Sequence, residues 1–166
     1  MISASIETTL SLGEWAVSND VDAVLTCLGL GSCVAFVAYD PVARVGGMAH
    51  VVLPDSTLGR PSPRAAAKFA DLAVPLVMQE MAALGALRSR VQVSLIGGAR
   101  MLAGGRVQDS LNIGERNITA TRAAVQALGL HVRMEETGGG QGRTVRLPVR
   151  TGGLSISTAR AFRAAA

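Results

Sequence analysis

The chain has 166 residues, of which 49% are hydrophobic and 17% are charged. This composition excludes an intrinsically disordered protein and is sufficient for one buried core. The net charge of +4 comes almost entirely from arginines that are spread singly along the chain, since Lys68 is the only lysine. A nucleic-acid-binding protein usually clusters such residues and interleaves them with aromatics, so we expect no nucleic-acid partner.

The sequence also bears on the cellular compartment. No apolar stretch approaches the roughly 20 residues that span a bilayer, and the first residues lack the basic and apolar segments of a signal peptide. The only cysteines are Cys27 and Cys33. Together these features predict a cytoplasmic protein without direct membrane insertion, in a reducing environment.

The first third of the chain predicts strands. Residues 6–20 predict a short strand followed by a polar turn. Three apolar runs follow, at 21–30, 33–40 and 46–53. A turn at Pro41 separates the last two runs, and a hairpin centred near residues 41–42 would bring the second run back beside the first.

The middle of the chain alternates a helix, a strand and a second helix. Apolar residues recur with helical spacing over residues 63–85, and Pro63 and Gly85 suit the first turn and the end of a helix. Pro75 lies inside this segment and predicts a kink or a break. Residues 90–99 alternate like a strand. Residues 112–130 predict a second helix, which should begin near Gly114 and end at Gly129.

The last part predicts a hairpin over residues 131–152 with its turn in the glycine-rich segment 138–142, and one more short strand within the tail 154–166. We see no internal repeat and no linker, and therefore expect a single domain over residues 1–166. Strands outnumber helices and cluster at both ends, which favours an α+β fold, with antiparallel or mixed sheets packed against two main helices.

The segment "GLGSCV" is the first candidate for chemistry. A nucleophilic cysteine needs a base, an accessible sulfur and N–H groups that can hold an oxyanion. The turn before Cys33 can aim the backbone N–H groups of Ser32 and Cys33 at one point. The base must be one of two histidines, His50 or His131. Only His50 would return near Cys33, and only if the two flanking runs pair as a hairpin.

Simpler alternatives apply to the same residues. A cysteine in an apolar run is often a small buried hydrophobe, and a histidine in an apolar strand is often a core residue. A Cys27–Cys33 disulfide is disfavoured by a reducing compartment. The chain contains no C-x-x-C or H-x-x-x-H spacing, no G-K-[ST] and no complete dinucleotide fingerprint, so we expect neither a metal nor a cofactor.

The segments "LGLGSCVAFVAYDP" and "GGMAHVVLPDS" resemble the signature of the CheD family of chemoreceptor glutamine deamidases. The similarity continues through "VSLIGGARML", "NIGERNITATRAAVQALGL" and "ETGGGQGRTVRLPVRTG" and covers nearly the whole chain. The resemblance implies a protein-glutamine glutaminase of bacterial chemotaxis that hydrolyses glutamine side chains on the cytoplasmic domain of a chemoreceptor. It implies an α/β sandwich related to toxin-type cysteine deamidases, Cys33 as the nucleophile and His50 as the catalytic histidine. It also implies a CheC-type phosphatase as a partner of some members.

One position departs from this pattern. The family carries threonine six residues before the nucleophile, where this chain has Cys27 and places Thr26 one residue earlier. Neighbours on a regular strand point to opposite faces, so Thr26 could replace the expected threonine only if a bulge shifted the register. Thr26 and Cys27 are therefore both candidates for the group that orients His50.

Two residues near the C-terminal turn are weaker candidates. Arg143 and Thr144 follow the glycine-rich segment and either contact the substrate or belong to an ordinary hairpin. The departure at Cys27 also leaves an alternative function open. On that alternative, the protein is a non-catalytic module that binds a CheC-type phosphatase or a receptor helix.

Overall fold

The structure is a computed structural model, and it describes residues 5–100 and 110–158. Along these residues the strands are β1 (Ile6–Thr9), β2 (Trp15–Ser18), β3 (Ala23–Leu30), β4 (Val34–Asp40), β5 (Val45–Val51), β6 (Gln92–Gly97), β7 (Val132–Thr137), β8 (Arg143–Pro148) and β9 (Ser155–Thr158). The helices are α1 (Ala70–Ala83) and α2 (Ser110–Ala127), with 3₁₀ turns at Ser56–Leu58, Pro63–Ala65 and Arg88–Arg90.

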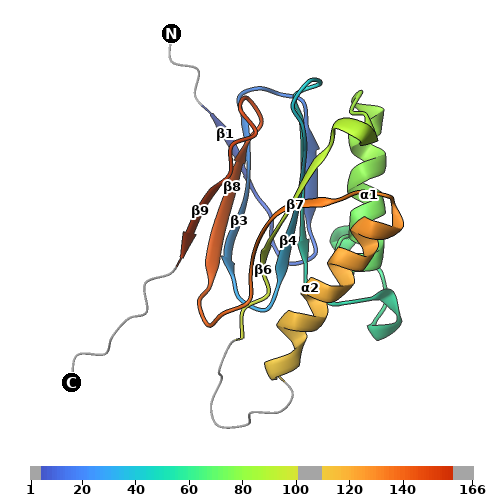
Figure 1. The fold of residues 1–166 in the computed structure, drawn as a ribbon, viewed down its shortest axis with the longest axis vertical. Helices are drawn as coiled ribbons and strands as arrows, with labels where there is room; N and C mark the ends of the chain where they lie inside the picture. The colour runs from blue at the N-terminus through green and yellow to red at the C-terminus, as the bar shows by residue number, and fades with distance from the viewer. Residues whose placement is uncertain (1–4, 101–109, 159–166) are drawn as a thin grey trace, which may run out of the picture.

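The strands form two mixed sheets that face each other. One sheet has the order β1-β3-β8-β9 and the other has the order β2-β5-β4-β6-β7. The pairs β1–β3 and β6–β7 are parallel, and the remaining pairs are antiparallel. Both helices cover the outer face of the five-stranded sheet, which gives a layer order of sheet, sheet and helices (Figure 1). The predicted α+β sandwich with two main helices is confirmed.

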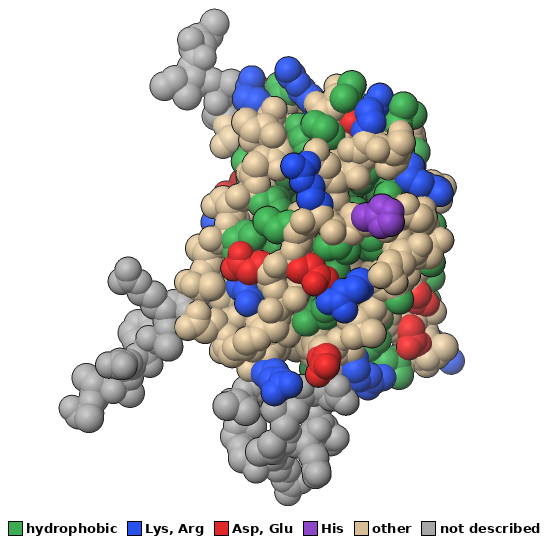
Figure 2. Space-filling model, viewed as in Figure 1, with side chains coloured by type: hydrophobic (Ala, Val, Ile, Leu, Met, Phe, Trp, Pro, Cys, Tyr) green, Lys and Arg blue, Asp and Glu red, His purple; other side chains and the backbone are tan. Residues whose placement is uncertain are grey.

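The surface carries charges of both signs. Acidic and basic side chains are interspersed over the visible face, and Figure 2 shows no large patch of one sign there. None of the helices in the described part of the chain is both long and apolar enough to cross a membrane.

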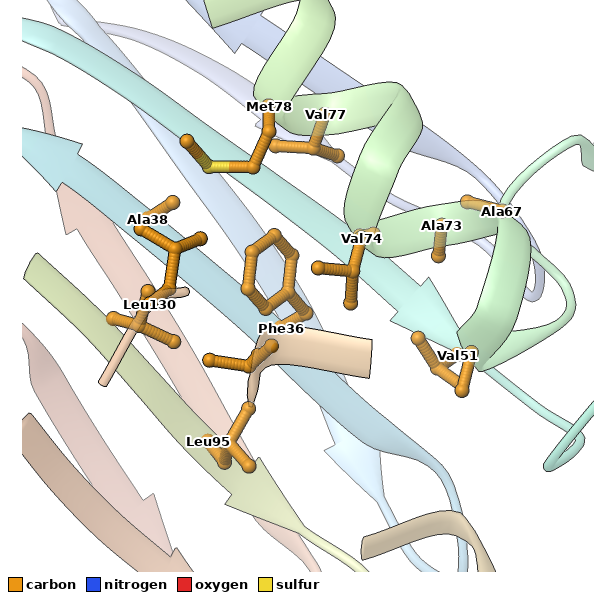
Figure 3. Packing of buried hydrophobic residues seen from close by; sticks show 14 of the residues in the cluster. Phe36, Ala38, Val51, Ala67, Ala73, Val74, Val77, Met78, Leu95 and Leu130 are labelled. Atoms are coloured by element: carbon orange, nitrogen blue, oxygen red, sulfur yellow. The ribbon is translucent and has the colours of Figure 1, made fainter. Parts of the chain in front are cut away.

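The central strands β4 and β5 are buried along their whole length. Their alternate residues face two different cores, one against the helices and one against the four-stranded sheet. Phe36 faces the helices and lies near Val74 and Leu95 (Figure 3). Because both faces are covered, these strands read as continuous apolar runs without the alternation of a half-exposed strand.

Two predictions about the strands are wrong. Residues 131–152 do not form a hairpin, because β7 pairs with β6 in one sheet while β8 pairs with β3 in the other. Gly138 and Gly139 have φ values of 77° and 72°, and this left-handed backbone lets the chain cross from one sheet to the other. Residues 6–20 likewise form two strands, β1 and β2, that belong to different sheets.

The helix predictions are confirmed in number and corrected at their ends. Pro63 begins a 3₁₀ turn, whereas α1 begins only at Ala70. The helix then runs through Pro75 without a break. Helix α2 already includes Ser110, one turn before Gly114, and ends at Ala127 just before Gly129, which has a φ of 69°.

Candidate active site

The hairpin of β4 and β5 places Cys33 and His50 on the same face of the five-stranded sheet. Ala35 lies directly opposite His50 in the register. The sequence had predicted a turn centred one residue earlier, which would have placed Cys33 itself opposite His50. The observed partner of His50 is two residues further along the chain than the predicted one. Because side chains alternate between the two faces of a sheet, a difference of two residues keeps the Cys33 and His50 side chains on the same face. The hairpin itself is confirmed, and the proximity of Cys33 to His50 stays a prediction, now with a diagonal rather than a direct pairing.

The turn that sets this register is held by Asp40. Its Oδ1 accepts hydrogen bonds from the backbone N–H groups of Val42 (2.9 Å) and Ala43 (3.1 Å). Arg44 completes the turn with a φ of 51°, and Asp40 pairs with Val45 across it. The connection therefore runs over residues 41–44, and its centre lies between Val42 and Ala43, one residue beyond the predicted centre.

Cys33 and His50 both face the space between the two sheets. Cys33 is partly buried and packs against the inter-sheet core, while the His50 side chain is almost entirely buried. Diagonal neighbours on adjacent antiparallel strands have Cα atoms about 7–8 Å apart and somewhat closer Cβ atoms. That separation is short enough for a thiol and an imidazole ring to approach one another.

The imidazole of His50 is oriented by a backbone carbonyl. Its Nδ1 lies 3.0 Å from the carbonyl oxygen of Leu10. A carbonyl can only accept a hydrogen bond, so Nδ1 carries the proton and Nε2 keeps a free lone pair. Burial lowers the pKa of His50 below 6.5 and outweighs the Leu10 bond and the Glu14 carboxylate, which both act to raise it. At neutral pH the ring is therefore neutral and can act as a base.

The segment between β1 and β2 fixes the His50 backbone from both sides. The Gly13 N–H donates to the His50 carbonyl, and the His50 N–H donates to the Glu14 carbonyl, each at 2.9 Å. The Leu10 N–H donates to the Thr26 carbonyl at 2.8 Å. The same segment therefore connects the two sheets and places the orienting carbonyl.

The loop that carries Cys33 is held through its carbonyl groups. The carbonyls of Gly31 and Cys33 accept hydrogen bonds from the backbone N–H groups of Ala99 (2.7 Å) and Gly98 (2.8 Å). Gly97, which has a φ of 115°, allows this approach, because a Cβ there would lie 2.3 Å from the Cys33 carbonyl oxygen. Within the described part of the chain, the N–H groups of Ser32 and Cys33 donate to no backbone carbonyl.

The two thiols are free and differ in their surroundings. Burial raises the pKa of Cys33 above its ordinary value of 9.0. Cys27 is wholly buried, and burial together with the charge on Cys33 raises its pKa to about 12. A neutral thiol next to a neutral imidazole is therefore the resting state, and Cys27 is chemically inert by comparison.

Thr26 does not take the place of the expected threonine. Its hydroxyl donates to Glu7 Oε1 at 2.8 Å, on the face of β3 that is turned away from Cys27 and the inter-sheet core. A bulge does occur in β3, between Cys27 and Leu30, where Gly29 has a φ of 58°. Because the bulge follows Thr26, it leaves the Thr26 side chain on the outer face.

Arg143 and Thr144 both bind the backbone near the turns. The Arg143 guanidinium donates to the Gly138 carbonyl at 2.8 Å and lies 3.7 Å from Glu136 Oε1. The Thr144 hydroxyl accepts a hydrogen bond from the Gly29 N–H at 3.1 Å, within the bulge that leads to Cys33. A substrate contact by either residue stays a prediction.

Sequence reasoning missed two groups at the site. The Leu10 carbonyl carries no signal in a residue type, because every residue has a carbonyl. Asn117 on α2 is wholly buried, and its Nδ2 donates at 2.9 Å to each of the Ser32 and Val52 carbonyls. A signal for Asn117 did exist, since it recurs at helical spacing with the buried Thr121 and Val125 and is a polar residue on an otherwise core-facing stripe.

The comparisons with known proteins bear on this site. The family model described as CheD chemotactic sensory transduction matches residues 52–158. The chain belongs to the CheD family. A probable chemoreceptor glutamine deamidase CheD of Symbiobacterium thermophilum is 44% identical over 149 residues, which cover 90% of each chain. The chemoreceptor glutamine deamidase CheD of Thermotoga maritima is 39% identical over 147 residues, which cover 89% of this chain and 88% of that protein.

Similar solved structures are more distant than these CheD relatives. YlmD from Geobacillus stearothermophilus has a TM-score of 0.43 and 14% identity, and the alignment covers 82% of this chain and 61% of that chain. The YfiH protein of Bacillus licheniformis has a TM-score of 0.41 and 13% identity, and the alignment covers 80% of this chain and 59% of that chain.

Proposed function

We propose that the protein is a chemoreceptor glutamine deamidase, a single-domain cytoplasmic enzyme over residues 1–166 that converts glutamine side chains to glutamate and releases ammonia. The observation that carries the proposal is the juxtaposition of Cys33 with His50, whose Nδ1 is occupied by the Leu10 carbonyl. The names of the CheD relatives, chemoreceptor glutamine deamidases, supply the substrate class.

In the first half-reaction the glutamine amide is exchanged for a thioester. His50 Nε2 takes the thiol proton of Cys33 as the sulfur attacks the glutamine Cδ. The electron pair of the Cδ=O bond moves to the oxygen, and the N–H groups of Ser32 and Cys33 stabilise the resulting oxyanion. When this intermediate collapses, the Cδ–N bond breaks and His50 gives its proton to the leaving nitrogen, which departs as ammonia.

In the second half-reaction water replaces the sulfur. His50 takes a proton from water, and the hydroxide attacks the thioester carbon at the same oxyanion site. The Cδ–S bond then breaks, the sulfur recovers its proton from His50, and glutamate is released. Because these reaction steps balance with water as the only co-substrate, the proposed mechanism requires no metal and no cofactor.

The resting protonation states favour a general-base route over a preformed ion pair. Burial raises the pKa of Cys33 and lowers that of His50. Both shifts oppose a thiolate–imidazolium pair in the free enzyme. The proton is therefore transferred as the substrate carbonyl approaches, when the developing negative charge passes from the sulfur to the oxygen.

The proposed protein partners are the cytoplasmic domain of a chemoreceptor, as the substrate, and a CheC-type phosphatase, as a regulator. The second partner follows from the family resemblance alone. Co-purification of the two proteins, with the effect of the phosphatase on the rate of ammonia release, tests it.

The activity is tested by incubating the purified protein with a receptor cytoplasmic domain and measuring released ammonia. We expect release by the wild type and none above background by Cys33→Ala or His50→Ala. Equal release by the wild type and Cys33→Ala would exclude the proposed nucleophile. Binding of the receptor without ammonia release by the wild type would instead support a non-catalytic module.

A further inference from the structure

The side chain of Asn117 connects helix α2 to the loop that carries the nucleophile. We propose that Asn117 is a positioning residue that aims the backbone N–H of Cys33 at the oxyanion of the reaction intermediate. This inference rests on the proposed function, because it assigns a role within the same catalytic cycle.

The hydrogen bonds of Asn117 determine the orientation of its amide. Nδ2 lies 2.9 Å from the carbonyl oxygen of Ser32 and 2.9 Å from that of Val52. Both partners are carbonyls that only accept, so the NH₂ end must face them. The two donors of the amide are thereby used on two different segments of the chain.

The bond to Ser32 acts on the peptide unit that contains the proposed oxyanion donor. The Ser32 carbonyl and the Cys33 N–H belong to one peptide group, and the described residues contain no cis peptide bond. In a trans peptide the C=O and N–H bonds point in opposite directions. Asn117 holds the Ser32 carbonyl, and the Cys33 N–H therefore points away from the Asn117 amide.

Hydrogen bonding at the carbonyl also strengthens the donor at the other end. An N–H···O=C bond polarises the peptide unit, which makes the N–H of that unit a better donor. The neighbouring carbonyls of Gly31 and Cys33 are bound by Ala99 and Gly98. The backbone around the nucleophile is thus fixed at three successive carbonyl groups, and only the middle one is held by a side chain.

The bond to Val52 links this loop to the strand that carries the base. Val52 follows β5 and lies two residues beyond His50. Asn117 therefore spans the open end of the β4–β5 hairpin and fixes the segments flanking nucleophile and base relative to each other. Helix α2 can approach because residue 114 is glycine, where a Cβ would lie 2.7 Å from the Gly98 carbonyl oxygen.

The side-chain oxygen of Asn117, Oδ1, indicates that this residue does not serve stability alone. Asn117 Oδ1 is buried and accepts no hydrogen bond from the described residues. A buried acceptor without a partner is a cost to the folded state, and such groups call for a functional reason. The two hydrogen bonds that Asn117 Nδ2 donates to the Ser32 and Val52 carbonyls provide that reason.

The test compares Asn117→Ala and Asn117→Asp with Thr121→Val. Aspartate keeps the shape of asparagine but cannot donate to both carbonyls at once, since a carboxylate has no donor and a carboxylic acid has one. Thr121 is one turn further along α2, is equally buried, and donates only to a backbone carbonyl within that helix. For each variant, kcat and KM for ammonia release are measured beside the rate of Cys33 alkylation by iodoacetamide, a displacement that forms no oxyanion on a carbonyl.

We expect both Asn117 variants to lower kcat by about 10- to 100-fold, since losing a whole oxyanion donor typically costs about 10²–10³ and here the donor is only misaligned. KM and the alkylation rate should stay within about threefold of wild type, and Thr121→Val should leave kcat within the same range. An unchanged kcat in the Asn117 variants, or alkylation that falls in parallel with kcat, would overturn the assignment. Undiminished turnover by Cys33→Ala would instead defeat the proposed function.

A second measurement needs no variant. A peptide that carries an aldehyde in place of the glutamine amide forms a thiohemiacetal with Cys33 and places an oxygen where the oxyanion would lie. In the wild-type protein the amide proton resonance of Cys33 should then move downfield, and the side-chain NH₂ resonances of Asn117 should persist with slow exchange. Thiohemiacetal formation without a downfield shift of the Cys33 amide would contradict the proposal.

Discussion

The Nδ1 atom of His50 lies 3.0 Å from the carbonyl oxygen of Leu10, a residue forty positions earlier in the chain and attached to the opposite sheet. The bond fixes both the tautomer and the direction of the His50 ring, and in the proposed mechanism it takes the task of the side-chain hydroxyl or carboxylate that orients a catalytic histidine. In this chain, which has Cys27 where the family resemblance implies a threonine, the group at His50 Nδ1 is a backbone carbonyl. The backbone carbonyl is present whatever the residue at position 27.

The pH dependence of the proposed reaction should reflect the burial of His50. Burial lowers the pKa of His50 below 6.5, so the imidazole stays neutral and basic at pH values somewhat below its ordinary pKa. We expect kcat/KM to hold as the pH falls to 6.5 and to decline only below it. A pH–rate profile measures this, and an acidic midpoint well above 6.5 would contradict the neutral resting imidazole.

The two thiols should differ strongly in reactivity. Cys33 is partly buried and beside a base, whereas Cys27 is wholly buried with a pKa raised to about 12. We expect iodoacetamide to label Cys33 in the folded protein at pH 8 and to label Cys27 only after unfolding. Peptide mapping with a Cys27→Ala control checks this, and comparable labelling of both thiols in the native protein would be inconsistent with the site geometry.

Replacing Thr26 should affect stability rather than catalysis. Its hydroxyl donates to Glu7 on the outer face of β3, and Glu7 also lies 3.0 Å from the Arg146 guanidinium. Thr26→Val removes this hydrogen bond and should lower the free energy of unfolding by about 1 kcal/mol while kcat stays within about twofold. Denaturant titration and ammonia release measure the two effects. A large fall in kcat would restore Thr26 as the orienting group.

Asp40 should contribute stability that depends on pH. Burial alone would raise its pKa, but the Arg90 guanidinium and the backbone N–H groups of Leu87, Ala43 and Val42 lower it to about 2. Because the folded pKa is below the unfolded value of 3.8, the contribution is complete above pH 3.8 and is lost as the pH falls through 2. Asp40→Asn should therefore cost about 2–3 kcal/mol at pH 7.

The difference in free energy of unfolding between wild type and Asp40→Asn should narrow as the pH is lowered from 4 to 2. Denaturant titrations of both proteins at several pH values measure it. A difference that stays constant across this range would show that the charge of Asp40 contributes nothing.

The sequence was informative where local patterns decide the structure. The Pro41 turn between two apolar runs predicted the hairpin that joins Cys33 to His50, and Gly129 marked the end of α2. The glycine-rich turn also pointed to the N–H groups of Ser32 and Cys33, whose role at an oxyanion stays a prediction. Such features depend on neighbours in the chain, so composition and spacing carry them.

The strand pairings that were predicted wrongly and the site groups that were missed depend on contacts between distant segments of the chain. Nothing local distinguishes a hairpin from two strands in different sheets, and β7 pairs with β6 while β8 pairs with β3. The Leu10 carbonyl enters the site because β1 pairs with β3, a relationship between residues that no turn connects. Asn117 likewise acquires its role only when α2 packs over the Cys33 loop.

The most direct test of the account is mass spectrometry of receptor cytoplasmic domain incubated with the wild type and with Cys33→Ala. Conversion of glutamine to glutamate replaces NH₂ by OH and adds about one dalton at each modified residue, so fragment masses also locate the site. We expect this increase on specific receptor glutamines with the wild type and no increase with Cys33→Ala, although that variant should unfold at a similar denaturant concentration. The same increase in both samples, or its absence with an active wild-type preparation that binds the receptor, would contradict catalysis by Cys33.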